Sequence, residues 1–302
     1  MKALEGGTEV ELAGLRLRNP LVVASGVLGV SVGLMVRAEK AGAGAITTKT
    51  TTLEPRAGNP NPVVYDLGYG LLNSMGLPNP GAAQMGEVIR EAKSRLTVPI
   101  IASIGAASPS EAVNIAEHLL LADALELNAS CPHAKGLGVE LMADPLLISK
   151  IVSELKNLSK PVFVKVSAHG DYVRVAGKAL EGGADAVVAI NTLKGMVIDV
   201  WAKKPVLGGI YGGLSGRAIH PVAVRVVYEL HREYPDVPIV GVGGVESWVE
   251  AVELMLAGAT AVGIASALKK GFSVIGEILD GIKRYLSEEG FKSVKELVGA
   301  AH

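Results

Sequence analysis

The chain has 302 residues, with 29 Lys and Arg against 30 Asp and Glu, so its formal net charge is −1. This balance excludes the strong positive field that binding to nucleic acid or to an acidic membrane surface requires. Hydrophobic residues make up 49% of the chain and 37 residues are Gly, a composition that excludes disorder as the main state. The one cysteine, Cys131, cannot form an internal disulfide or ligate an iron–sulfur cluster alone, and it indicates a reducing, hence cytoplasmic, location.

Residues 19–36 carry no charged side chain and are about as long as a membrane span. Three glycines interrupt this stretch, and they favour a buried strand, a glycine turn and the start of a helix instead. Near the N-terminus, Glu5, Glu9 and Glu11 lie where a signal peptide needs an apolar core. We therefore expect neither a membrane span nor a signal peptide.

A recurring pattern organises the chain: an apolar helix ends in a turn of small residues, and a short β-branched strand follows. It is clear at residues 39–47, 180–190 and 256–264, and weaker at 119–127. This order of helix, cap and strand is typical of α/β repeats. Eight strands are predicted, at residues 21–24, 45–48, 100–103, 125–128, 162–166, 186–190, 239–241 and 261–264.

Predicted helix starts between the strands support this assignment of strands. Ser108 with Glu111, and Ser247 with Glu250, have capping-box spacing, and Asp144 precedes a proline suited to the first helical position. Eight strand–helix units predict an α/β fold, a TIM (β/α)8 barrel, with a doubly wound open sheet as the alternative. We expect extended loops after strands 2, 4 and 6, and one domain over residues 1–302 because no linker divides the chain.

Polar residues follow nearly every predicted strand, where barrel enzymes place their active sites. Any one of them could equally cap a strand or lie in a solvated loop. The set comprises Ser25, Lys49, Thr50, Ser103, Asn128, Cys131, Lys165, Asn191, Thr192, Gly243, Gly244 and Ser266.

Glycine-rich segments at residues 241–245 and 263–266 follow the last two strands, where barrels bind phosphate through backbone N–H groups. Residues 212–216 form a third such turn, although tight packing alone also produces this composition. Lys49 and Lys165 end apolar strands and should point into the barrel mouth, where a buried ammonium needs an anion. A ligand could supply that anion, or Glu126 could.

Cys131 lies in a polar turn, residues 126–133. A lone cysteine can be an inert buried residue, but a thiol at a catalytic face can take a carbon-bound proton near neutral pH. His133 is a second candidate for acid–base chemistry. Gly136 and Gly138 suit a loop that closes over the site.

At these residues the chain resembles the soluble class of dihydroorotate dehydrogenases, FMN-dependent barrels of pyrimidine biosynthesis, over about residues 19–268. Residues 73–81 look like the family's substrate loop, residues 126–132 like its catalytic loop, and residues 190–196 with 212–216 like its sixth-strand segment. The resemblance implies oxidation of dihydroorotate to orotate in de novo UMP synthesis. A base removes a proton from C5 while hydride passes from C6 to FMN.

The resemblance also implies a role for each site residue, with Cys131 as the base, Lys165 beside the flavin ring, and no metal. FMN contacts fall on Ser25, Lys49, Thr50, Ser103, Asn128, Lys165, Ile190, Gly216, Gly243, Gly244, Ala265 and Ser266. Dihydroorotate contacts fall on Lys49, Asn73, Ser74, Met75, Gly76, Leu77, Asn128, Asn191 and Thr192.

The chain departs from the family at three places. The family usually has Asn at the positions of His133 and Ser103, and Gly-Thr at the position of Ala265 and Ser266. These changes put one substrate contact, one flavin contact and the fit of the phosphate in question.

The electron acceptor divides the family into branches. Residues 195–199 with 204–205 resemble the NAD-linked branch, which implies a homodimer joined by a second subunit with FAD and a [2Fe–2S] cluster in a heterotetramer. Residues 73–78 instead resemble the fumarate-linked branch, and an archaeal variant with another accessory subunit is a further alternative. The quinone-linked membrane branch uses a serine base and an N-terminal extension, which Cys131 and the start of this chain do not match.

The sequence is also compatible with three other functions. A flavoenzyme acting on another dihydropyrimidine would share the barrel and FMN. A phosphate-binding isomerase would purify without flavin, and a catalytically silent assembly subunit would tolerate loss of Cys131.

Overall fold

The computed structural model describes residues 7–130 and 139–302. In this part of the chain, eight parallel strands close a barrel in chain order. They are β3 (Leu21–Val23), β4 (Ala45–Thr47), β7 (Ile100–Ile104), β8 (Ala124–Asn128), β9 (Val162–Val166), β10 (Ala186–Ala189), β15 (Ile239–Val242) and β16 (Ala261–Ile264). Because β16 pairs with β3, the sheet has no open edge. The predicted TIM barrel is confirmed, each strand lies within one residue of its predicted bounds, and the open-sheet alternative is wrong.

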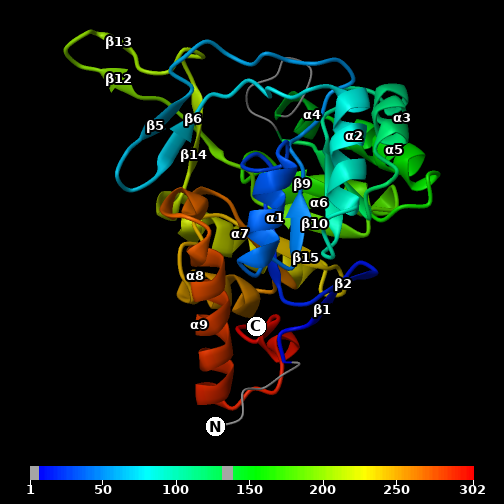
Figure 1. The fold of residues 1–302 in the computed structure, drawn as a ribbon, viewed down its shortest axis with the longest axis vertical. Helices are drawn as coiled ribbons and strands as arrows, with labels where there is room; N and C mark the ends of the chain where they lie inside the picture. Colours follow the sequence, from blue (N-terminus) through cyan, green and yellow to red (C-terminus); the bar gives the residue numbers. More distant parts are fainter. Residues whose placement is uncertain (1–6, 131–138) are drawn as a thin grey trace.

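Helices surround the barrel, and each buries one apolar face against the strands (Figure 1). One helix follows each barrel strand, as the right-handed βαβ connection requires. These helices are α1 (Val32–Lys40), α2 (Ala82–Lys93), α3 (Pro109–His118), α5 (Pro145–Lys156), α6 (Tyr172–Glu181), α7 (His220–Glu233), α8 (Trp248–Leu256) and α9 (Ser273–Glu289). Shorter helices are α4 (Val139–Met142) and the 3₁₀ turns η1 (Arg217–Ile219), η2 (Ser266–Lys270) and η3 (Val294–Leu297).

The predicted helix starts are largely as expected. Ser247 and Glu250 form a capping box at α8, and the Asp144 carboxylate accepts from the Leu147 N–H (3.0 Å) at α5. At α3, Ser108 Oγ accepts from the Glu111 N–H, but the Glu111 carboxylate accepts from the Ala107 N–H instead of the Ser108 N–H. The helix therefore begins as predicted with half of the predicted box.

A β-hairpin precedes the barrel and was not predicted from the sequence. Its strands are β1 (Val10–Leu12) and β2 (Leu15–Leu17), and the first and last residues of each strand are buried in the core. Ala13 and Gly14 both have positive φ, as a two-residue turn that matches the twist of a hairpin requires. The strands are too short for their alternation to stand out in the sequence.

The loops after β4 and β10 join in a separate four-stranded sheet at the carboxyl end of the barrel, in the order β11-β14-β6-β5 (Figure 1). The strands are β5 (Val64–Asp66), β6 (Leu71–Asn73), β11 (Leu193–Gly195) and β14 (Gly212–Ser215). The hairpin of β12 (Ile198–Asp199) and β13 (Lys204–Pro205) extends outward beside it, and its Trp201 is 91% exposed. The loop predicted after the fourth barrel strand lies partly outside the described residues.

Residues 19–36 form β3, a glycine turn and the start of α1, as predicted. Within the described ranges, no helix has the length and apolar character needed to cross a membrane.

Candidate functional site

A cavity of about 480 Å³ lies at the carboxyl ends of the barrel strands, within the range of small-molecule sites. A smaller pocket adjoins it beside β15 and β16. The residues that line both are Ser25, Lys165, Asn191, Thr192, Ser215, Ala265 and Ser266. Together they form one elongated site. Of the predicted residues, the cavity is lined by Ser25, Lys49, Thr50, Asn73, Met75, Gly76, Leu77, Asn128, Lys165, Asn191, Thr192, Ala265 and Ser266, and the smaller pocket adds Ile190, Gly216, Gly243 and Gly244.

Thr50, just beyond β4, is the centre of a hydrogen-bond network in the cavity wall. Its Oγ1 lies 3.2 Å from Ser25 Oγ and 3.0 Å from Ser103 Oγ, and it accepts from Asn128 Nδ2 at 3.0 Å. The network thus joins the ends of β3, β4, β7 and β8. Ser103 is fully buried and lines neither pocket, so it lies one step behind the wall.

A second part of the network orients two amides. Asn191 Nδ2 donates to Asn128 Oδ1 at 3.1 Å and also contacts Ser130 Oγ at 3.1 Å. Asn191 Oδ1 accepts from the Thr192 N–H at 2.8 Å. Ser130, which the sequence reasoning missed, is buried and donates to the Lys165 carbonyl at 3.2 Å. Asn128 and Asn191 are therefore held in fixed orientations at the cavity wall.

Lys165 lies on β9 and is only 5% exposed, yet it lines both pockets. Among the described residues no carboxylate forms an ion pair with it. Glu126 instead accepts from Ser103 Oγ at 2.8 Å, and it lines a separate small cavity inside the barrel. Lys49 lines the larger cavity. The alternative in which Glu126 pairs with Lys165 is therefore wrong, and a buried cation faces the site.

Glycines form the wall of the smaller pocket. Gly216, Gly243 and Gly244 all have positive φ (90°, 143° and 71°), which side chains rarely adopt. A Cβ at Gly243 would lie 2.7 Å from Ala223 Cβ, and one at Gly244 would lie 2.8 Å from the Gly216 carbonyl oxygen. Only backbone fits here, and N–H groups in such a concave turn suit an anion. We call Gly216, Gly243 and Gly244 the glycine cradle.

The segment expected to bind substrate reaches the cavity through β6. Asn73 Nδ2 donates to the Gly213 carbonyl at 3.1 Å, and Met75, Gly76 and Leu77 continue along the wall. Ser74 is fully buried and lines neither pocket. Its Oγ accepts from Asn59 Nδ2 at 3.0 Å.

Three further predictions, Cys131, His133 and the loop 135–138, lie outside the described residues. The sequence reasoning also missed Ser215, which lines both pockets, although it had noted the turn 212–216. An apolar wall of Val27, Leu28 and Phe272 was missed because isolated apolar residues in loops have no periodic signal. In the described ranges no three His, Cys, Asp or Glu side chains are grouped to hold a metal.

A sequence model of the family described as "Dihydroorotate dehydrogenase" matches residues 8–286, most of the chain. The chain belongs to the dihydroorotate dehydrogenase family. It is 46% identical to a protein of Pyrococcus abyssi over 97% of this chain and 98% of that protein. It is also 46% identical to a protein of Thermococcus kodakarensis, over 97% of both chains, and 45% identical to one of Methanosarcina acetivorans, over 96% and 95%.

Each of these relatives is named "Dihydroorotate dehydrogenase B (NAD(+)), catalytic subunit". The predicted membership of the dihydroorotate dehydrogenases is therefore confirmed, and the similarity places the chain with the B-type branch.

Proposed function

We propose that this chain is the catalytic subunit of an FMN-dependent dihydroorotate dehydrogenase, which oxidises dihydroorotate to orotate in pyrimidine biosynthesis. The observation that carries the proposal is one elongated site with a glycine cradle at one end and oriented amides with a lysine at the other. The glycine cradle suits the phosphate of a nucleotide, and the amides with the lysine suit an anionic pyrimidine. We further propose that residues 1–302 act as a single domain.

The residues present fit FMN. The glycine cradle would hold the phosphate, with Ala265 and Ser266 beside it, and Ser25, Thr50 and Asn128 would line the flavin. Lys165 would lie beside the flavin ring, where its charge would stabilise the reduced, anionic form. Bound FMN would supply the acceptor for the hydride that leaves C6 of the substrate. The roles of Ser103 and Ser74 stay predictions, and their burial behind the wall favours indirect ones.

The other end of the cavity suits the substrate. Asn73, Asn128 and Asn191 offer amide donors and acceptors, which match the imide edge of a dihydropyrimidine. The Lys49 ammonium would neutralise the substrate carboxylate, and Thr192 and residues 75–77 would complete the wall. The resemblance makes Cys131 the base: its thiolate takes the C5 proton as hydride leaves C6, so the C5–C6 bond becomes double.

We infer that NAD is the final acceptor, through a partner. The relatives compared above carry the name of a NAD-linked catalytic subunit. Because this chain has one cysteine, a [2Fe–2S] cluster would have to be held by a second subunit, together with FAD. We propose a homodimer of this chain within a heterotetramer, in the cytoplasm.

Anaerobic mixing of the purified, FMN-loaded protein with dihydroorotate tests the activity. The flavin absorbance should bleach and orotate should form in equal amount. Dihydrouracil, which lacks the carboxylate that Lys49 would bind, is the matched control and should bleach the flavin far more slowly. A protein that takes up no FMN, or one reduced equally well by dihydrouracil, would overturn the proposal in favour of an isomerase or another dihydropyrimidine oxidoreductase.

The acceptor is tested separately with the reduced protein. Rapid reoxidation of the chain alone by fumarate would contradict the NAD assignment. Slow reaction with both fumarate and NAD, and fast reaction with NAD once the partner subunit is added, would support it.

A further inference from the structure

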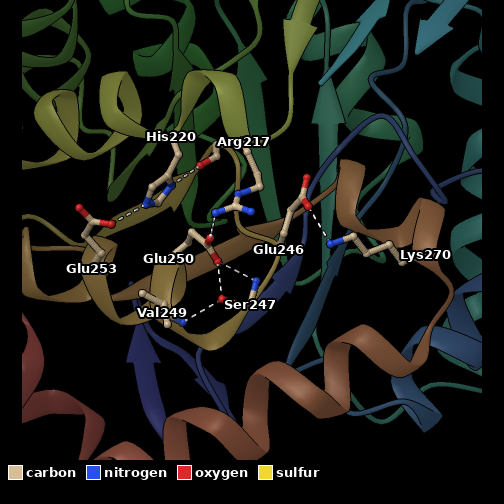
Figure 2. A network of polar contacts seen from close by, with 9 residues as sticks. Arg217, His220, Glu246, Ser247, Val249, Glu250, Glu253 and Lys270 are labelled. Carbon is tan, nitrogen blue, oxygen red and sulfur yellow. Dashed lines mark hydrogen bonds and ion pairs between the residues drawn. The ribbon is translucent and has the colours of Figure 1, made fainter. Parts of the chain in front are cut away.

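A histidine lies directly behind the glycine cradle. His220 is the first residue of α7 and is 7% exposed, and it does not line the pocket itself. Its Nδ1 lies 2.8 Å from the Gly243 carbonyl oxygen, and its Nε2 lies 3.0 Å from Glu253 Oε2 (Figure 2). Because a carbonyl oxygen only accepts, His220 Nδ1 donates to Gly243.

The contact with Gly243 sets the direction of the next N–H group. In a trans peptide the carbonyl and the following N–H point in opposite directions, and the Gly243–Gly244 peptide is trans. With the Gly243 carbonyl directed at His220, the Gly244 N–H is directed away from His220, and Gly244 itself lines the smaller pocket.

This peptide needs an external restraint. Glycines on both sides, with φ of 143° and 71°, give it wide rotational freedom at little steric cost. His220 supplies the restraint in two ways: it donates to the carbonyl, and its Cβ lies 2.7 Å from the position that a Cβ on Gly244 would take. His220 thus both binds the Gly243 carbonyl and packs close to the Gly244 backbone.

The histidine is itself held by α8. Glu253 projects from α8 and is exposed, with a side-chain exposure of 53%. The start of α8 is fixed by the Ser247–Glu250 box, and Glu250 also lies 3.7 Å from Arg217 (Figure 2). Burial opposes ionisation of Glu250, but hydrogen bonds from Ser247 and the charge of Arg217 lower its pKa below the ordinary value.

We propose that His220, oriented by Glu253, is a positioning residue that fixes the Gly243–Gly244 peptide so that the Gly244 N–H binds the cofactor phosphate. This inference rests on the proposed function, because it takes the FMN phosphate as the ligand of the cradle. It adds a residue that touches neither substrate nor cofactor.

The test compares binding of FMN and of riboflavin, which lacks the phosphate, to apoprotein by quenching of flavin fluorescence. His220→Ala should weaken FMN binding about tenfold, the loss expected for one well-oriented hydrogen bond, and leave riboflavin binding unchanged. His220→Asn should restore most of the affinity, because its amide can donate to the Gly243 carbonyl in place of Nδ1. His118→Ala, at an exposed histidine of α3, is the matched control and should bind both ligands normally.

Equal FMN binding by wild type and His220→Ala would overturn the inference, and so would equal weakening of FMN and riboflavin, which would mean a general structural role. If His220→Ala does not fold, Glu253→Ala carries the same comparison, with the same outcomes for and against. If wild type itself fails to bind FMN, the proposed function fails instead, so the two failures are distinct.

Discussion

Lys165 shows how one residue can connect burial to function. It is almost fully buried, and the described carboxylates leave it unpaired, so its charge is directed at whatever fills the cavity. Lys165→Ala should therefore weaken FMN retention or lower the flavin reduction potential, because the anionic reduced ring loses its counter-charge. Redox titration and fluorescence binding measure the two effects. Lys178→Ala, on the exposed face of α6 with Glu181, should change neither, and unchanged retention and potential in Lys165→Ala would count against the assignment.

Cys131 carries the other residue-level prediction. Cys131→Ala should keep its flavin but slow flavin reduction by dihydroorotate by roughly 10²–10⁴, the usual contribution of a positioned base. Stopped-flow mixing without oxygen measures this rate directly. Reduction at the wild-type rate would reject Cys131 as the base and leave His133 as the candidate.

Site residues could be predicted from the sequence where they follow a barrel strand whose end was itself predictable. Ser25, Thr50 and Asn191 all line the cavity because barrel topology gathers the ends of parallel strands at one face. Ser130 and Ser215 were not predictable as site residues, since a small polar residue in a turn has the same pattern whether it binds a ligand or the backbone. His220 was missed because its relation to Gly243 exists only in the folded chain.

At the scale of the element, the capping box of α8 is the clearest sequence-encoded feature. Ser247→Ala removes the side chain that accepts from the Val249 N–H and donates to Glu250, so we expect a loss of about 1 kcal/mol in the free energy of unfolding. Chemical denaturation measures it. Ser287→Ala, at an exposed position within α9, is the control and should stay within about 0.5 kcal/mol of wild type. An equally stable Ser247→Ala would mean that tertiary packing alone fixes the start of α8.

Element prediction succeeded for the barrel and failed for the loops, for one physical reason. Barrel strands are buried on both sides and read as short β-branched runs between helices. Strands β5, β6, β11 and β14 are three or four residues long, and each finds its partner through tertiary contacts, such as Leu72 with Leu214. No local pattern specifies such a pairing.

At the scale of the whole molecule, the C-terminal segment returns to α7. The rings of His302 and Tyr228 stack with centroids 3.9 Å apart, and His231 meets His302 edge-on at 4.9 Å. In the described chain His231 Nδ1 is buried without a hydrogen-bond partner. Burial, and then the charge of His302, lower the pKa of His231, so the fold favours its neutral form.

This arrangement predicts a pH dependence of stability. Because the folded pKa of His231 is below the unfolded value, its contribution is fully present above the ordinary histidine pKa of about 6.5 and is lost as pH falls toward the folded value. The urea midpoint should thus fall between pH 7 and pH 5, and fall less in His231→Phe. Measuring the urea midpoint of both proteins at both pH values tests this. An equal fall in wild type and His231→Phe would exclude His231 as the cause.

The pairing of β6 with β14 connects the cavity to the sheet outside the barrel, because Asn73 of β6 lines the cavity. Asn73 is opposite Gly213, so a shift of one residue anywhere along that ladder would turn the amide to the reverse side of the ribbon. An insertion or deletion within β6 or β14 would therefore turn Asn73 away from the cavity that it lines. The alignment of two short strands outside the barrel thus determines which side chain faces the pocket.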